Sequence, residues 1–508
     1  MVDSDSHENG RRSGVSRRRF VQAAGASGVT VGLAGCISSG GDGGSGDGGD
    51  GGTGTAINTS APEEDVTVKW AADTRVADNK KGIIDAMRKA GLPDNITVEI
   101  VAGSQVTDNR QSQYQQWLSA NREEPTLLMM DSGWTIPFIV RDQLQNLSSA
   151  LPSGMTDIIN NEYFEASVNT AKHPETGDLY GMPLFPDFPT IQYRKDLMKK
   201  AGFTEDDFST WAQESMSWQE FSQAVKKTMD ADGVDVDYGF NFQASIYEGL
   251  SCCDFNEFMT SFGGSYFGPH KNLFGPVGDR PVTVDEQPVI DSIKMVRSLI
   301  HGSDAKNTMD GIAGVSPEAV LQWTEEPSRQ PFTNGNAVAL RNWPYSININ
   351  GAEDAFGEDL GVMPIPYGVK ASEAQYDGTG GPVAALGGWH MTMNPNAPET
   401  KKQAAVQVLQ VMQKEQFQLD LFGLVGWIPP RPKLLDSDQA KEVELIGRYL
   451  PQLKVAGENA VPRPVTAVWP QQSGKIAQQV NSAYAGKKTP KKAMSDLKAT
   501  LEQIESNA

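Results

Sequence analysis

The stretch Thr126-Leu-Leu-Met-Met-Asp-Ser-Gly-Trp134 decides the fold class, because it joins an apolar run to a polar turn. An unbroken run such as 126–130 is typical of a strand covered on both faces of a sheet. Upstream, residues 66–70 alternate like a strand, residues 80–90 carry apolar side chains at helical spacing, and residues 97–101 are rich in β-branched residues. With a helical stretch around 114–120, this order predicts an α/β fold.

The turn after the buried run is the first candidate ligand position. In open α/β sheets, ligands bind beyond the carboxyl ends of the strands. Asp131 and Trp134 follow the predicted strand directly. We therefore expect both side chains at a binding site.

Chain length and the far end extend this picture. Residues 65–508 exceed the size at which one hydrophobic core stops growing, so we expect two lobes. Thr489 and Pro490 open a final helix whose apolar residues recur at three and four positions.

The first 36 residues read as an export signal. Ser16-Arg-Arg-Arg-Phe-Val21 places arginines before an uncharged stretch, 21–35, that is too short to span a bilayer. The stretch ends in Leu33-Ala-Gly-Cys36, which resembles the lipobox of lipoproteins. We expect twin-arginine export, a lipid anchor on Cys36, and a location on the extracellular face of the cytoplasmic membrane.

Residues 37–64 are predicted to be a flexible tether. From Gly40 to Gly54 the chain is almost entirely Gly, Asp and Ser, a composition that buries nothing. Such a leash suits delivery of a solute to a fixed membrane partner.

Composition excludes several classes of partner and site. The formal net charge of -20 argues against nucleic acid and anionic lipid surfaces. The five histidines stand singly, without metal-ligand spacing, so we expect no metal site and no cofactor. Cys252 and Cys253 can form a vicinal disulfide or remain two small core residues, and we favour the core interpretation.

No catalytic motif is found, and we assign no catalytic residue. There is no G-x-S-x-G elbow and no H-E-x-x-H, and Gly486-Lys-Lys-Thr489 lacks the upstream glycine of a P-loop. The paired carboxylates of a glycoside hydrolase depend on a spatial separation that the sequence does not reveal, so this enzyme class stays an alternative.

Aromatic residues recur beside turn-forming and polar residues. Because a sugar has an apolar C–H face and a rim of hydroxyls, Trp beside Asp, amide or Arg is the composition expected of a sugar site. The segments are Asp131-Ser-Gly-Trp134, Asn342-Trp-Pro-Tyr345, Gly387-Gly-Trp389, Gly426-Trp-Ile-Pro-Pro-Arg431 and Val468-Trp-Pro470. Any one of these rings, taken alone, is better explained as part of the core.

Several blocks occur in the order of a known family. They are Leu179-Tyr-Gly-Met-Pro183, Ile191-Gln-Tyr-Arg-Lys-Asp196, Ala201-Gly-Phe203, Ser217-Trp-Gln-Glu-Phe221, Phe332-Thr-Asn-Gly-Asn-Ala-Val-Ala339, Gly361-Val-Met-Pro-Ile-Pro366, Gly387-Gly-Trp389 and 482–497. With them the chain resembles family 1 of the extracellular solute-binding proteins of ABC importers, in the maltose- and trehalose-binding group. Ala339 stands where the family usually has Met.

The resemblance implies two α/β lobes with an interlobe hinge and a ligand cleft. Lobe 1 would comprise 65–183 and about 385–432, and lobe 2 about 184–384 and 433–508. The implied function is capture of a sugar, such as maltose or trehalose, by lobe closure, followed by delivery to the ABC permease subunits in the membrane. We expect a monomer. A peptide, a polyamine or another solute on the same scaffold is the alternative ligand.

The resemblance also implies ligand contacts in both lobes. Which ring of Trp-Pro-Tyr, 343–345, stacks on the ligand is open, because the family more often has Gly-Pro-Trp there. The ligand-binding residues implied are Asp131, Trp134, Asp187, Gln243, Tyr247, Trp343, Tyr345, Gly387, Gly388, Trp389, Arg431 and Trp469.

Overall fold

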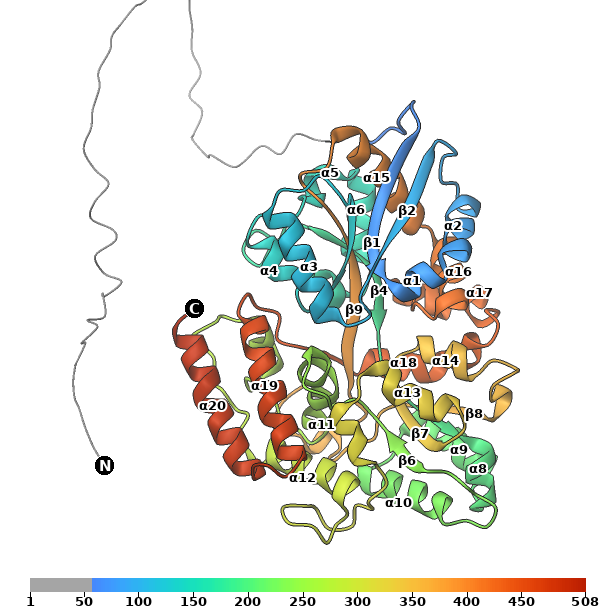
Figure 1. The fold of residues 1–508 in the computed structure, drawn as a ribbon, viewed down its shortest axis with the longest axis vertical. Coiled ribbons are helices and arrows are strands. Elements are labelled where there is room, and N and C mark those ends of the chain that lie inside the picture. Colours follow the sequence, from blue (N-terminus) through green and yellow to red (C-terminus); the bar gives the residue numbers. More distant parts are fainter. Residues whose placement is uncertain (1–56) are drawn as a thin grey trace, which may run out of the picture. The chain divides into compact units, whose positions relative to one another are not determined.

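The computed structural model describes residues 57–508, in which two separate sheets are each surrounded by helices (Figure 1). The predicted export signal, Cys36 and most of the predicted tether lie outside the described residues. The larger sheet is six-stranded in the order β10-β9-β3-β1-β2, with β4 also paired to β9. Its strands are β1 (Val66–Asp73), β2 (Ile96–Gly103), β3 (Leu127–Asp131), β4 (Gly181–Asp187), β9 (Ala384–Met393) and β10 (Ala460–Pro462).

The larger sheet is mixed in direction. β1 pairs in parallel with β2 and β3, as expected for strands joined by helices, while β9 runs antiparallel to β3 and β4. All five residues of β3 and all ten of β9 are buried, because helices cover both faces.

The smaller sheet is four-stranded in the order β6-β7-β5-β8. Its strands are β5 (Thr190–Arg194), β6 (Tyr238–Asn241), β7 (Ala337–Asn342) and β8 (Leu360–Met363). β5 runs antiparallel to β7 and β8, and β6 runs parallel to β7. We call the bodies built on the larger and the smaller sheet the first and the second lobe.

Two strands carry the chain between the lobes. β4 ends at Asp187 and the chain re-forms as β5 from Thr190. β9 pairs with β10 through Ala384–Leu386 and with β3 farther along, so one strand runs through the junction (Figure 1). This connectivity confirms the predicted α/β fold of two lobes.

The helices fill the outer layers of both lobes. Those of the first half are α1 (Thr74–Asp78), α2 (Lys80–Lys89), α3 (Thr107–Ser119), α4 (Thr135–Ile139), α5 (Leu147–Ala150), α6 (Ser153–Glu162), α7 (Glu165–Asn169), α8 (Lys195–Lys200), α9 (Glu205–Glu214) and α10 (Trp218–Met229). Those of the second half are α11 (Phe255–Ser261), α12 (Gln287–His301), α13 (Glu325–Thr333), α14 (Tyr345–Asn350), α15 (Glu399–Met412), α16 (Glu415–Val425), α17 (Asp438–Lys441), α18 (Leu450–Glu458), α19 (Trp469–Tyr484) and α20 (Pro490–Ser506).

The elements predicted from periodicity are confirmed. α2 buries Ile83 and Met87 on one face, as the helical spacing predicts. The final helix starts at Pro490, with the Thr489 side chain accepting the amide of Lys492 as its N-cap.

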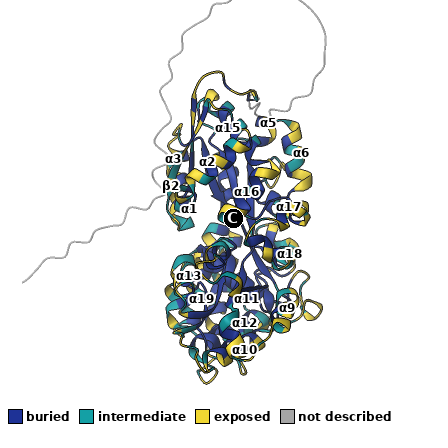
Figure 2. Cartoon of the chain, turned by 90° about the vertical axis from the view of Figure 1, so that its right-hand side faces the viewer, coloured by how far each residue is buried: buried dark blue, intermediate teal, exposed yellow. Residues whose placement is uncertain are grey.

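Each lobe has its own hydrophobic core. One core packs α2, α3 and α15 around the larger sheet, and another packs α10, α11, α12, α19 and α20 around the smaller one. In Figure 2 the strands are buried, while exposed residues lie on the outer faces of helices such as α6 and α10.

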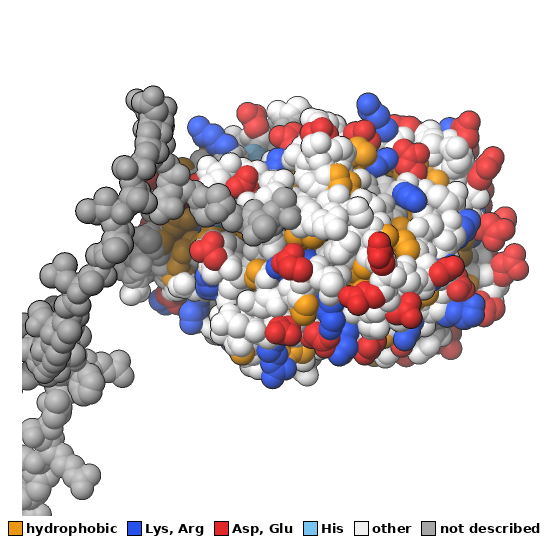
Figure 3. All heavy atoms as spheres, turned by 90° about the horizontal axis from the view of Figure 1, so that it is seen from above, with side chains coloured by type: hydrophobic (Ala, Val, Ile, Leu, Met, Phe, Trp, Pro, Cys, Tyr) orange, Lys and Arg blue, Asp and Glu red, His pale blue; other side chains and the backbone are white. Residues whose placement is uncertain are grey.

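Acidic and basic side chains are interspersed over the surface. On the face shown in Figure 3, Asp and Glu are spread widely among Lys and Arg, and the basic residues do not gather into one patch there. Among residues 57–508, no helix is both long enough and apolar enough to cross a membrane.

A short π-helix, Leu250–Asp254, precedes α11 and contains both neighbouring cysteines. Cys252 and Cys253 are joined by a disulfide. The interpretation of these residues as two unpaired core cysteines was wrong. Their burial was foreseen, but the conformation of this turn places the two sulfur atoms together.

A buried ion pair fixes this π-helix segment to the sheet. Arg341, on β7, donates to both carboxylate oxygens of Glu257, on α11, at 2.9 and 2.8 Å. Its guanidinium also lies 3.4 Å from Asp254 and donates to Gln243 Oε1 at 2.9 Å. Glu257 in turn accepts the amide of Ala385 at 2.9 Å, at the start of β9. The cluster therefore connects β7, α11 and the interlobe strand.

We predict that Arg341→Met lowers the free energy of unfolding by about 3–5 kcal/mol, because it leaves two buried carboxylates without their cation. Denaturant unfolding checks this. The matched control is Lys81→Met, whose side chain is 91% exposed and pairs with Asp85, and which should leave the midpoint unchanged. Equal midpoints for Arg341→Met and the natural chain would contradict the prediction.

Candidate functional site

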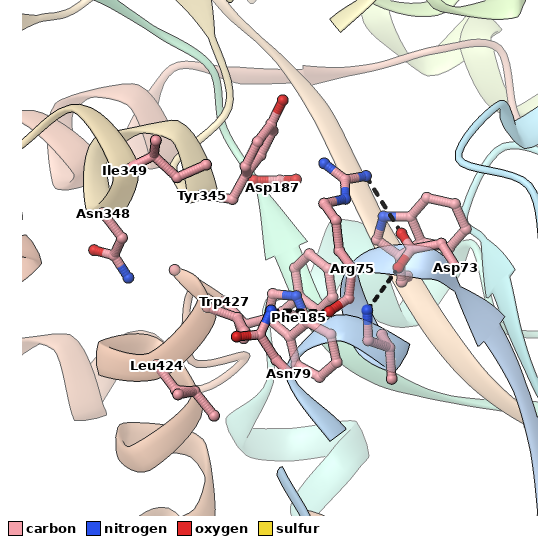
Figure 4. Close-up of a pocket in the computed structure, with 14 residues that line it drawn as sticks. Asp73, Arg75, Asn79, Phe185, Asp187, Tyr345, Asn348, Ile349, Leu424 and Trp427 are labelled. Atoms are coloured by element: carbon pink, nitrogen blue, oxygen red, sulfur yellow. Dashed lines mark hydrogen bonds and ion pairs between the residues drawn. The ribbon is translucent and has the colours of Figure 1, made fainter. Parts of the chain in front are cut away.

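Two adjoining cavities lie between the lobes and share Arg75, Asp187 and Trp389 in their walls. The first has a volume of about 230 Å³ and is shown in Figure 4. Its wall consists of Asp73, Arg75, Val76, Asn79, Phe185, Asp187, Tyr345, Asn348, Ile349, Trp389, Leu424, Val425, Gly426 and Trp427. Both lobes contribute, since Tyr345, Asn348 and Ile349 belong to α14 beside the smaller sheet.

Aromatic rings form one side of the first cavity. Trp427 stacks on Phe185 with ring centroids 4.6 Å apart and planes 14° from parallel (Figure 4). Trp427 is placed there by the end of α16, where Gly426 adopts a left-handed conformation. A Cβ at Gly426 would lie 2.8 Å from the Cα of Tyr345, so glycine also permits close approach of α14.

A charged pair at the carboxyl end of β1 faces these rings. Asp73 caps α1 by accepting the amide of Val76 at 3.1 Å, and its other oxygen lies 3.3 Å from Arg75. The Arg75 guanidinium lies 4.4 Å from the ring centroid of Tyr345, a cation–π contact between the lobes (Figure 4).

The second cavity is smaller, about 60 Å³, and more polar. It is lined by Arg75, Gln105, Thr107, Asp131, Asp187, Tyr247, Gly249, Cys252, Cys253, Glu325, Trp343, Gly387, Gly388, Trp389 and Arg463. Tyr247 donates to Glu325 at 2.9 Å, which fixes both side chains in the wall.

Arg463 joins the two lobes at this cavity. Its Nη1 lies 2.9 Å from Asp131, at the end of β3, and 3.1 Å from Glu248, in the second lobe. The Trp469 indole donates to the same Glu248 oxygen at 3.1 Å and so orients it. Burial raises the pKa of Glu248 to about 7, against the opposing effect of Arg463.

Two glycines on β9 permit the close packing around the second cavity. A Cβ at Gly387 would lie 2.9 Å from the Trp343 ring. At Gly388 the backbone φ is +129°, and a Cβ would lie 2.7 Å from the carbonyl oxygen of Phe185. The predicted glycine pair therefore lets the Trp343 ring approach β9 at Gly387 and the backbone of β4 approach it at Gly388.

Asp187 lies at the end of β4, where the two cavities meet. Burial raises the pKa of Asp187 to about 8, Arg75 and Arg341 oppose this shift, and Asp131 and Glu325 add to it. Below this pH the carboxyl group keeps its proton and can both donate and accept a hydrogen bond. A group of this kind can bind a hydroxyl as either donor or acceptor.

The cavities bring together most of the predicted site residues. Those that line a cavity are Asp131, Asp187, Tyr247, Trp343, Tyr345, Gly387, Gly388 and Trp389. Trp343 lines the second cavity and Tyr345 the first, so both rings after β7 face the space between the lobes, and which of them stacks on a ligand stays a prediction.

Four predicted ligand contacts lie elsewhere, each held by protein partners. Trp134 is fully buried between Tyr114 and Phe138. Gln243 is fully buried and its amide nitrogen donates to the Arg341 carbonyl.

Arg431 and Trp469 complete this group of four. Arg431 binds Glu415 at 3.0 Å and the carbonyl of Gln413 at 3.1 Å, outside both cavities. Trp469 is fully buried and supports the cavity wall only through Glu248.

Sequence reasoning missed Asp73, Arg75, Glu325 and Arg463. A signal existed for the first two, because Asp73 follows a predicted strand as Asp131 does. No local sequence signal marked Glu325, at the start of α13, or Arg463, just after β10. Only tertiary folding brings these two segments to the cleft. Among residues 57–508, no cluster of side chains has the composition and geometry of a metal site.

Comparison with known proteins identifies the relatives of this chain. Residues 83–446 match the family model described as bacterial extracellular solute-binding protein. A probable ABC transporter-binding protein from Deinococcus radiodurans is 28% identical over 447 residues, covering 86% of this chain and 94% of that protein.

Two solved structures are similar over nearly their whole length. Maltose-bound T. maritima MalE3 has a TM-score of 0.70 and 26% identity, covering 86% of this chain and 99% of that chain. UgpB from Mycobacterium tuberculosis, in complex with glycerophosphocholine, has a TM-score of 0.65 and 16% identity, covering 87% of this chain and 99% of that chain. The second likeness shows the fold alone.

We predict that Asp187 makes the protein less stable as pH rises from its ordinary pKa toward 8, with no further loss above that pH. The unfolded carboxyl group loses its proton near its ordinary pKa, whereas the folded group holds it to about pH 8, so this contribution to stability falls between those values. The thermal midpoint of Asp187→Asn, measured relative to that of the natural chain, should therefore rise between pH 5 and pH 9.

The control for this prediction is Asp85→Asn, whose side chain is 62% exposed. Its midpoints should run parallel to those of the natural chain over the same range. If Asp187→Asn also ran parallel, the raised pKa of Asp187 would be refuted.

Proposed function

This chain belongs to the family of bacterial extracellular solute-binding proteins, and we propose that it captures a sugar and delivers it to an ABC permease. The sugar class proposed is a di- or oligosaccharide such as maltose or trehalose. The chain's relatives are solute-binding proteins of transport, and we assign it no catalytic role.

One observation carries the proposal: aromatic rings and hydrogen-bonding side chains converge on the same space between the lobes. Trp427, Tyr345 and Trp389 offer ring surfaces that suit the apolar face of a pyranose. Asp131 and Glu325 offer acceptors in the adjoining cavity. Sugars combine an apolar face with a hydroxyl rim, and this wall provides for both.

The charge balance of the cleft favours a neutral ligand over a polyamine or cationic peptide. Arg75 lies against Asp73, and Arg463 against Asp131, so these carboxylates already have cations. Asp187 retains its proton at neutral pH because of burial. A cationic ligand would have to compete with arginines that are part of the protein.

Lobe closure is the proposed means of signalling occupancy. The proposed lobe boundaries are 65–183 with about 385–432, and about 184–384 with 433–508, although the larger sheet also includes β10 and the end of β4. Because cavity walls come from both, a ligand that contacts both favours the closed arrangement, and a permease that recognises this arrangement thereby senses the ligand.

The proposal includes a location. Twin-arginine export, lipidation of Cys36 and a flexible tether through residue 64 would hold a monomeric binding protein beside its permease on the extracellular face of the membrane. The family's extracellular role supports this placement. The sequence pattern of residues 16–36 supports the proposed lipid anchor.

The first test is thermal unfolding of the full chain against maltose, trehalose, monosaccharides, amino acids and polyamines. A ligand that binds only the native state adds about 2.7 kcal/mol to the free energy of unfolding at a hundredfold excess over Kd, and so raises the thermal midpoint. We expect a rise with maltose or trehalose and no release of glucose. A rise with polyamines or peptides alone would remove sugar from the proposal, and glucose release would indicate a hydrolase.

The second test removes one ring. We predict that Trp427→Ala weakens maltose binding about tenfold by calorimetry, because it removes a stacking surface and its contact area. The matched control is Trp211→Ala, a half-buried tryptophan on α9 that packs on Phe203 and Phe208 and lines neither cavity. Equal losses in both variants would contradict a binding role for Trp427.

A further inference from the structure

The disulfide between Cys252 and Cys253 lies in the wall of the second cavity. The two residues are 4% and 3% exposed, so the little surface that they present is at this wall. They share the cavity with Asp131, Trp343 and Trp389. The disulfide is therefore among the groups that a molecule in the cleft would touch.

Buried hydrogen bonds hold the π-helix on both sides of the disulfide. The Tyr266 hydroxyl donates to the Ser251 carbonyl at 2.5 Å, and the Ser251 hydroxyl pairs with that of Ser473 at 2.6 Å. On the other side, Asp254 accepts the amide of Gln243 at 3.1 Å and lies against Arg341. The disulfide is thus presented from a fixed segment.

The chemistry of the remaining wall shows what the disulfide adds. Arg75, Asp131, Asp187, Glu325 and Arg463 are all hydrogen-bonding or charged groups. The apolar surface of the second cavity comes from two tryptophan rings, the ring of Tyr247 and the disulfide. A disulfide carries no proton to donate, and sulfur is polarizable, so it contacts carbon-bound hydrogens well.

We propose that the Cys252–Cys253 disulfide is a ligand-contacting surface that takes the apolar C–H face of a sugar ring. This inference rests on the proposed sugar-binding function and adds a contact to it. Because the disulfide closes the two side chains into one ring, they lose no rotamer freedom when the ligand binds. Two free thiols would lose that freedom and would place two S–H donors in the same space.

A redox consequence follows. A dithiol reductant transfers two electrons and two protons to the disulfide, so the S–S bond breaks, two S–H bonds form, and the reductant closes into its own disulfide. A sugar seated on the disulfide blocks the attacking thiolate. Occupancy should therefore slow the reduction, and reduction should weaken binding.

The experiment compares maltose and trehalose binding by calorimetry to the oxidised full chain, the chain reduced with dithiothreitol, and C252A/C253A. We expect about fivefold weaker binding in the reduced chain and in the double variant. Dithiothreitol should leave the affinity of the double variant unchanged. This result would show that the reductant weakens binding only by breaking the Cys252–Cys253 disulfide.

A second measurement does not depend on a variant folding. Alkylation of Cys252 and Cys253, located by peptide mapping, gives the rate of reduction with and without saturating sugar, and we expect the sugar to slow it. Unchanged affinity on reduction, together with an unchanged reduction rate, overturns the disulfide contact while sugar binding stands. No binding of either sugar by the oxidised chain overturns the proposed function and the contact with it.

Discussion

The buried pair of Arg341 and Glu257 is the interaction on which the cleft depends. Taking these charges out of water is costly, and the structure offsets the cost with two charge-assisted hydrogen bonds and with Gln243. Glu257 also accepts the amide of Ala385 at the start of β9. The Arg341 guanidinium lies 4.7 Å from the ring centroid of Trp343, so the same cation that ties helix to strand also supports a ring of the cavity wall.

Direct contacts between the lobes bear on the proposed closure. Arg75 lies on Tyr345, and Arg463 joins Asp131 to Glu248. These contacts stabilise the arrangement of the lobes in this structure, and under the proposed function a ligand shifts the population only by what it adds to them. A ligand that broke the Arg463 contacts would lose buried, charge-assisted bonds, so a neutral solute that leaves them intact gains most from closure.

Sequence patterns predicted the frame better than the site. Strands such as β1 and β3 were identified because their apolar periodicity reflects burial, and the rule that ligands meet strand ends located Asp131. The same rule applied equally to Asp73. Trp134 and Trp469 look like site rings in sequence because turn-forming neighbours surround them, yet both are core. Glu325 and Arg463 reach the cleft only through long-range packing, which no local pattern records.

The segment after α16 shows why ring placement follows from backbone geometry more than from composition. Trp427 and Arg431 stand in one short stretch, but the left-handed Gly426 directs Trp427 onto Phe185, while Arg431 binds Glu415 outside the cavities. The residues that face the ligand space thus come from helix ends, strand ends and the π-helix, and several of them, such as Phe185, Trp343 and Trp389, also belong to the hydrophobic cores.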